Sequence, residues 1–185
     1  MMGTGHRIGA ATVVVGVGLA QIELAPRAGW EALPVAQVVA AALLAVPFSA
    51  GRFSPDADNR GWIKRRFGHR RTLHWWGWPV AVLVLVVALG LPWPCYGPAL
   101  GWLSHLFPFD FLFGKGGRSI PKGIPLWPWR GCKRLGLNLR VSAKQSAIER
   151  AAGSRRTHSL AESAFTVVLA VTLTGELYLL AGLAG

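Results

Sequence analysis

Long apolar stretches alternate along the chain with short polar or strongly basic segments. A helix needs about 20 mostly apolar residues to cross the hydrocarbon core of a membrane, and five stretches meet or approach that length. They are Ile8–Ala25, Ala32–Ala50, His74–Trp93, Cys95–Phe113 and Ser159–Leu183. The pattern predicts an all-α fold, a polytopic membrane bundle of about five transmembrane helices that forms a single integral-membrane domain over residues 1–185.

The first apolar stretch has a second interpretation. Met1–Ala25 could be a cleaved signal peptide, with Arg7 as a short basic region and Ala10–Ala20 as its apolar core. Cleavage would remove His6 and leave the rest of the predicted topology unchanged.

Two segments between the apolar stretches are strongly basic. Arg60–Arg71 has six Lys or Arg residues and Gly114–His158 has eleven, so together they hold 17 of the 20 basic residues. Because Lys and Arg concentrate in cytoplasmic loops of membrane proteins, we expect cytoplasmic loops over about 51–73 and 114–158, the second of them irregular. The amino terminus is then cytoplasmic, and the expected location is the cell (inner) membrane.

Composition narrows the class of protein further. The chain is 52% hydrophobic with a mean hydropathy of +0.38, which excludes a disordered protein, and its formal net charge is +12. In a chain this apolar, basic loops are best explained by topology and by contact with anionic lipid headgroups, so membrane lipids are the expected partners and nucleic acid is not. Cys95 and Cys132 are predicted on opposite sides of the membrane and therefore should not form a disulfide.

Histidines and aspartates gather on the predicted cytoplasmic side, in or beside the apolar stretches. They are His6, Asp56, Asp58, His69, His74, His105 and Asp110. The topology was assigned from Lys and Arg alone, so this one-sided distribution is an independent observation. Imidazole and carboxylate together suit a divalent ion, zinc first, with manganese or iron as alternatives. Such an ion lowers the pKa of bound water and supports hydrolysis.

Each of these residues also has an ordinary structural interpretation. Asp56 and Asp58 could serve only a turn, because Asp and Asn favour turns. His69 and His74 could face lipid headgroups. His105 lies within an apolar stretch, where ionisable residues are costly and usually functional, although a structural hydrogen bond to a neighbouring helix would also account for it.

Several short motifs follow one another in a characteristic order over about residues 5–140. They are Gly5-His6, Ser54-Pro55-Asp56-Ala57-Asp58-Asn59, Gly68-His69-Arg70-Arg71-Thr72-Leu73-His74, Leu100-Gly101-Trp102-Leu103-Ser104-His105 and Gly123-Ile124-Pro125-Leu126-Trp127-Pro128. In this order the chain resembles the LexA-regulated, membrane-bound metal-dependent hydrolase family. The resemblance implies a hydrolase without naming its substrate.

Together, the cluster and the resemblance give an integral-membrane metal-dependent hydrolase as the leading hypothesis. The seven His and Asp residues above are the candidate metal ligands. Arg70, which would stabilise a developing negative charge, and Asp58 are the candidate catalytic residues. The basic surroundings favour an anionic phosphoester or lipid-like substrate.

The chain departs from the family pattern at several points. Asn59 stands where the family often has His, and Arg71-Thr72-Leu73 replaces Gly-Phe-Thr. Asp110 lies five residues after His105 instead of four, which on an ideal helix turns it about 140° away unless Pro108 introduces a kink or bulge.

These departures leave a non-catalytic alternative, a membrane scaffold or stress-response protein with a degenerate metal site and lipid-binding loops. A small transporter is less favoured, since the third and fourth stretches lack polar residues through their outer halves.

Overall fold

The computed structural model describes the backbone of residues 2–59, 61, 73–110, 124–125, 140–141 and 155–184, and the side chains of 3–57, 61, 73–107 and 163–183. Over this part of the chain five α-helices form, which confirms the predicted all-α class. They are α1 (Met2–Leu24), α2 (Val35–Ser49), α4 (Gly77–Ala88), α5 (Gly97–Ser104) and α9 (Arg155–Ala184).

Shorter elements connect and extend these helices. They are the 3-10 helices η1 (Pro26–Ala28), η2 (Pro55–Asn59) and η3 (Trp93–Tyr96), the π-helix η4 (His105–Asp110) and the antiparallel pair β1 (Ile124–Pro125) and β2 (Arg140–Val141). In the β pair Ile124 is opposite Val141 and Pro125 is opposite Arg140. Because α9 begins at Arg155, it includes the last residues of the segment predicted as a basic loop.

Among the described residues, two helices are long and apolar enough to cross a membrane: α1 over Gly3–Leu24 and α9 over Ser163–Leu183. The apolar helices α2 and α4 have 15 and 12 residues, or about 22 and 18 Å at 1.5 Å per residue, which is less than the ~30 Å of a hydrocarbon core. The helices fall where the apolar stretches predicted them, but crossing by α2, α4 and α5 stays a prediction.

Local sequence explains why the middle helices are short. Helix α2 begins after Pro34 and ends at Ser49, because the next residue, Ala50, already has an extended backbone with a φ of −150° and a ψ of 142°. Helix α4 ends before Gly90, which has a φ of 59°. Proline follows at Pro92, so the apolar run to Leu91 is longer than its helix.

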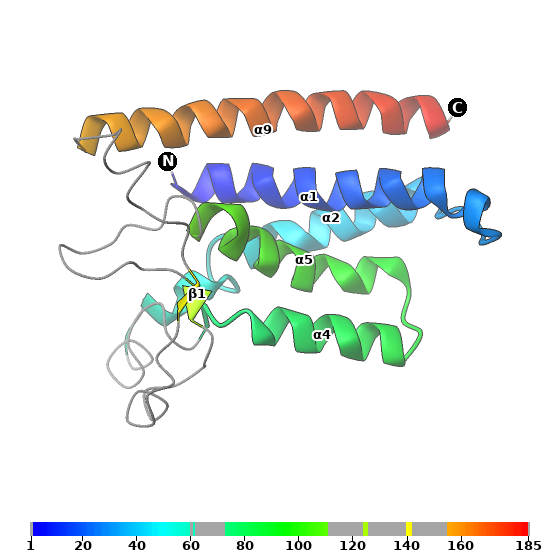
Figure 1. The fold of residues 1–185 in the computed structure, drawn as a ribbon, viewed down its shortest axis with the longest axis horizontal. Coiled ribbons are helices and arrows are strands. Elements are labelled where there is room, and N and C mark those ends of the chain that lie inside the picture. Colours follow the sequence, from blue (N-terminus) through cyan, green and yellow to red (C-terminus); the bar gives the residue numbers. More distant parts are fainter. Residues whose placement is uncertain are drawn as a thin grey trace.

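The helices form a bundle in which the amino-terminal ends of α1, α4 and α9 and the carboxyl-terminal ends of α2 and α5 lie at one end (Figure 1). The connections from α2 to α4 and from α5 to α9 therefore leave from that end. These connections contain the two basic segments. The turn between α1 and α2 and the one between α4 and α5 lie at the opposite end.

Helix α9 lies along α1 at the edge of the bundle (Figure 1). Thr12 on α1 donates hydrogen bonds to the carbonyl oxygens of Ile8, at 3.0 Å, and Leu169 on α9, at 3.3 Å. Further along, Gly16 gives room for the Glu176 carboxyl: a Cβ at Gly16 would lie 2.8 Å from Glu176 Oε1. Small and hydroxyl side chains thus allow the close approach of these two helices.

Helices α5 and α2 lie in close contact, and this contact depends on two glycines. A methyl group at Gly97 or Gly101 would overlap the backbone carbonyl oxygen of Ala41 or Ala45, respectively. The spacing of four residues on both helices puts glycine opposite alanine twice in succession, as in small-residue packing of membrane helices. Both alanines are fully buried, and they form a core cluster with Ala10 and Val14 of α1.

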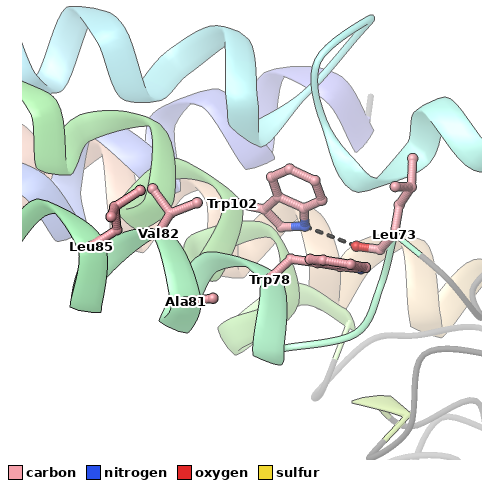
Figure 2. Close-up of a pocket in the computed structure, with 6 residues that line it drawn as sticks. All are labelled: Leu73, Trp78, Ala81, Val82, Leu85 and Trp102. Atoms are coloured by element: carbon pink, nitrogen blue, oxygen red, sulfur yellow. Dashed lines mark hydrogen bonds between the residues drawn. The ribbon is translucent and has the colours of Figure 1, made fainter.

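Helix α5 is also hydrogen-bonded to the segment before α4. The indole Nε1 of Trp102 donates a hydrogen bond of 2.9 Å to the carbonyl oxygen of Leu73 (Figure 2). This bond fixes the position of the turn in which His74 lies relative to α5.

We expect Gly101→Ala to destabilise the protein by about 1–3 kcal/mol, the usual range for overpacking a close contact. The cause is the overlap of the added methyl with the Ala45 carbonyl. Thermal unfolding of the purified protein in detergent measures the effect.

Gly175→Ala is the matched control, because a Cβ at Gly175 on α9 meets nothing within 4 Å. Alanine favours a helix by about 1 kcal/mol over glycine, so this variant should be as stable as the wild type or more stable. Equal melting temperatures for Gly101→Ala and wild type would contradict the close-packing account.

Candidate metal centre

His105 begins the π-helix that extends α5, and it is almost fully buried. Its Nδ1 lies 2.7 Å from the carbonyl oxygen of Ser49 at the end of α2. A helix leaves its last carbonyl groups without intrahelical partners, so the Ser49 carbonyl can accept this bond. Since a carbonyl only accepts, Nδ1 carries the proton, and Nε2 holds the lone pair in the neutral ring.

Asp56 faces His105 from the short 3-10 helix η2, which follows α2. The turn before it is held by buried Ser54, whose hydroxyl donates to the Gly51 carbonyl at 3.0 Å, and by the Ala57 amide, which donates to the Ser54 carbonyl at 3.0 Å. Ser54 and Pro55 are buried, whereas the Asp56 side chain is 44% exposed. The carboxylate therefore has one side toward the imidazoles and one side open.

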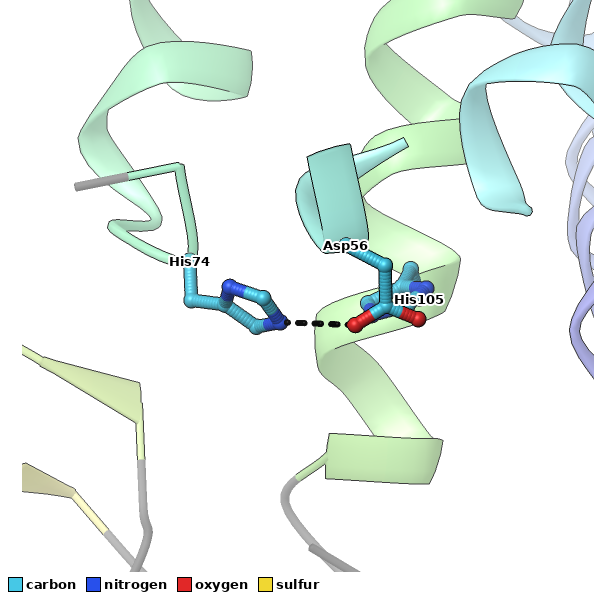
Figure 3. A group of neighbouring side chains, drawn as sticks. All are labelled: Asp56, His74 and His105. Atoms are coloured by element: carbon cyan, nitrogen blue, oxygen red, sulfur yellow. Dashed lines mark ion pairs between the residues drawn. The ribbon is translucent and has the colours of Figure 1, made fainter. Parts of the chain in front are cut away.

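His74 approaches the same carboxylate from the turn before α4 (Figure 3). Its Nε2 lies 3.6 Å from Asp56 Oδ1, and His105 Nε2 lies 3.9 Å from the same oxygen. Both distances exceed the 2.7–3.2 Å of a direct hydrogen bond. They are close to the ~3.3–3.5 Å that separates neighbouring ligand atoms around a tetrahedral ion with bonds of about 2.0–2.2 Å.

These three residues satisfy the geometric requirement for a metal site. One ligand atom each from Asp56, His74 and His105 lies within 4.8 Å of the others. Two imidazoles and one carboxylate form a ligand set used by catalytic zinc sites, which keep a further position open. The hydrogen bond from His105 Nδ1 to a backbone carbonyl is the support that metal-binding histidines usually have.

His6 adds a third imidazole from α1. Its ring stacks on that of His105 with centroids 4.2 Å apart and an angle of 17° between the planes, and His6 is 7% exposed. His74 meets His105 edge-on, with centroids 5.4 Å apart. Three histidines from three parts of the chain therefore meet at the end of the bundle to which the basic segments connect.

The structure brings together four of the sequence-predicted ligands: His6, Asp56, His74 and His105. The backbones of Asp58 and Asp110 belong to η2 and η4, but their side chains lie outside the described part, as do His69 and Arg70 entirely. Their roles stay predictions. The backbone between His105 and Asp110 does leave the α-helical path, since Phe107 has an extended φ of −125° and ψ of 122°.

Sequence reasoning did not find two features of the site. One is which group bonds to His105: the hydrogen bond to a neighbouring helix that the sequence left open does form, and its acceptor is the Ser49 carbonyl, which has no side-chain signal and is a partner only because α2 ends there. The other is the stacking of His6 on His105, which depends on the packing of α1 against α5.

Comparison of the chain with protein-family models, with curated proteins and with solved structures found no match.

Loss of one ligand should remove the metal. We expect the purified wild-type protein to carry about one divalent ion per chain. His74→Ala or His105→Ala should weaken its binding by more than the roughly tenfold to 100-fold that loss of a hydrogen-bond partner behind a metal ligand costs. Elemental analysis after dialysis against a weak chelator measures the metal content.

His158→Ala is the control, because His158 is not one of the predicted metal ligands. The ion should also raise the melting temperature of the wild type, since a ligand that binds only the folded state stabilises it by about 2.7 kcal/mol at 100 times its Kd. A wild type that carries no divalent metal and melts at the same temperature with and without zinc would refute the metal centre.

Proposed function

We propose that the chain is an integral-membrane metal-dependent hydrolase with a His/Asp site at the cytoplasmic face. We further propose an anionic phosphoester or lipid-like substrate. The observation that carries this proposal is the convergence of Asp56, His74 and His105, whose ligand atoms lie within 4.8 Å of one another. These residues are far apart in sequence and come from separate elements, so local structure alone does not account for their meeting.

The exposure pattern favours a catalytic centre over a structural one. Structural zinc sites are closed by four protein ligands, whereas catalytic sites keep a position for water or substrate. Here the histidines are buried and Asp56 is 44% exposed. Zinc fits this ligand set best, and manganese or iron would also accept it.

The proposed orientation rests on charge. Both basic segments are connected to the end of the bundle that holds the site, and the positive-inside rule makes that end cytoplasmic. For a multi-pass arrangement, α2 and the α4–α5 pair would cross beside α1 and α9. Exposed apolar side chains on α4, such as Val84 and Val87, support contact with lipid.

The reaction we propose is hydrolysis of a phosphoester. A water oxygen forms a bond to phosphorus, the bond from phosphorus to the alcohol oxygen breaks, and that oxygen takes up a proton. A bound divalent ion would supply hydroxide near neutral pH. Arg70 would stabilise the negative charge on the phosphoryl oxygens, and Asp58 would serve as a ligand or proton acceptor beside Asp56.

Membership of the LexA-regulated membrane-bound hydrolase family is part of the same proposal. It is supported by the ordered motifs and by the meeting of residues from four of them: His6, Asp56, His74 and His105.

Activity should depend on Asp56. In protein reconstituted into vesicles with zinc or manganese, we expect a phosphoester panel that includes phosphatidic acid to give phosphate or alcohol release. Asp56→Asn should lower the rate by about 100-fold or more, because removal of a metal ligand removes the activated water. A colorimetric phosphate assay and lipid mass spectrometry measure the products.

Glu23→Gln is the matched carboxylate-to-amide control. Glu23 lies at the opposite end of the bundle, exposed and paired with Arg27 at 3.1 Å, so its substitution should leave the rate unchanged. Metal-loaded wild type that hydrolyses no member of the panel would contradict the hydrolase proposal and favour the non-catalytic scaffold.

A further inference from the structure

An apolar groove lies between α4 and α5 (Figure 2). It has a volume of about 450 Å³, within the 300–1,000 Å³ range of small-molecule sites. Its lining residues are Leu73, Trp78, Ala81, Val82, Leu85 and Trp102. The indole N–H of Trp102 donates a hydrogen bond to the Leu73 carbonyl, so both polar groups already have a partner. The surface that the groove offers to an occupant is therefore almost wholly apolar.

The groove and the metal centre share the same two chain segments. Leu73 directly precedes His74, and Trp102 lies three residues, about one helical turn, before His105. A hydrocarbon chain that lies in the groove and ends near Leu73 and Trp102 would therefore end close to the two segments that carry His74 and His105.

The groove opens on the outside of the bundle, since Trp78, Val82 and Leu85 are 41%, 40% and 55% exposed. Helix α4 carries no charged side chain along its length. A groove that is apolar and open on an uncharged helix suits a hydrocarbon chain. A hydrocarbon chain that moves from the bilayer into the groove gains little hydrophobic free energy, because both surroundings are apolar. The groove would therefore contribute by positioning the chain and not by binding it tightly.

We infer that this groove holds one hydrocarbon chain of a lipid phosphoester and so places the ester at Asp56, His74 and His105. The inference rests on the proposed function and narrows its substrate class from phosphoesters in general to membrane lipids. A short soluble phosphoester would leave the groove empty.

The test uses full-length protein in phosphatidylcholine vesicles with phosphatidic acid that carries a diazirine at the end of one acyl chain. After illumination, adducts on each residue are mapped by mass spectrometry. We expect adducts to concentrate on the groove residues, and Val82→Trp to reduce them by about tenfold, because an indole would occupy the space that a close-packed chain needs.

Val87→Trp is the matched control. Val87 lies on the same helix, is 63% exposed and does not line the groove, so its adduct pattern should equal that of wild type. Adducts spread evenly along α4, with the same pattern in both variants, would indicate annular lipid only and overturn the inference. If a copurified protein prevented labelling of the groove residues, the groove would hold a protein and not a lipid chain, and the inference would be overturned.

A second readout separates this inference from the proposed function. Val82→Trp should lower kcat/KM for long-chain phosphatidic acid by about tenfold and leave turnover of p-nitrophenyl phosphate unchanged, since only the long chain uses the groove. An equal loss for both substrates would contradict a chain-positioning role. If the groove residues are labelled but the protein hydrolyses no phosphoester, only the proposed function is refuted. If the protein hydrolyses phosphatidic acid but labelling is even along α4, only the chain-binding inference is refuted.

Discussion

The close approach of α5 to α2 is the constraint on which the candidate site depends. It exists because Gly97 and Gly101 have no side chain where they meet the carbonyl oxygens of Ala41 and Ala45. One turn beyond Gly101, the same contact brings His105 Nδ1 to 2.7 Å from the Ser49 carbonyl. A wider separation of the helices would remove that bond, and with it the orientation that directs His105 Nε2 toward Asp56.

The candidate site combines buried parts with an open part, as the proposed reaction requires. His74 and His105 are buried and held by turns and helix ends, while Asp56 borders the exterior. The Trp102–Leu73 hydrogen bond joins the two segments that carry the histidines and also closes the polar edge of the apolar groove. One contact thus serves both the proposed metal centre and the proposed chain-binding surface.

Much of the fold could be predicted from the chain's hydropathy. The positions of the five described helices follow the apolar stretches, because burial or lipid contact of a long apolar run requires a backbone whose polar groups are satisfied internally. Helix lengths were predicted less well. Gly90 and Pro92 end α4 inside its apolar run, and α2 ends at Ser49 because Ala50 is extended. Both helices are therefore shorter than hydropathy alone indicated.

The order of the helices and the positions of Lys and Arg fix which helix ends lie on the same side. The sequence by itself therefore determined which residues lie at the end of the bundle that carries the basic segments. It therefore predicted His6, Asp56, His74 and His105 as part of one group, together with Asp58, His69 and Asp110. Only the tertiary structure decided that the rings of His6, His74 and His105 and the Asp56 carboxylate meet within a few ångströms. It also decided that the Ser49 carbonyl orients His105 and that an apolar groove forms between α4 and α5. These outcomes depend on helix separation and rotation, which are set by packing between distant residues and leave no local signal in the sequence.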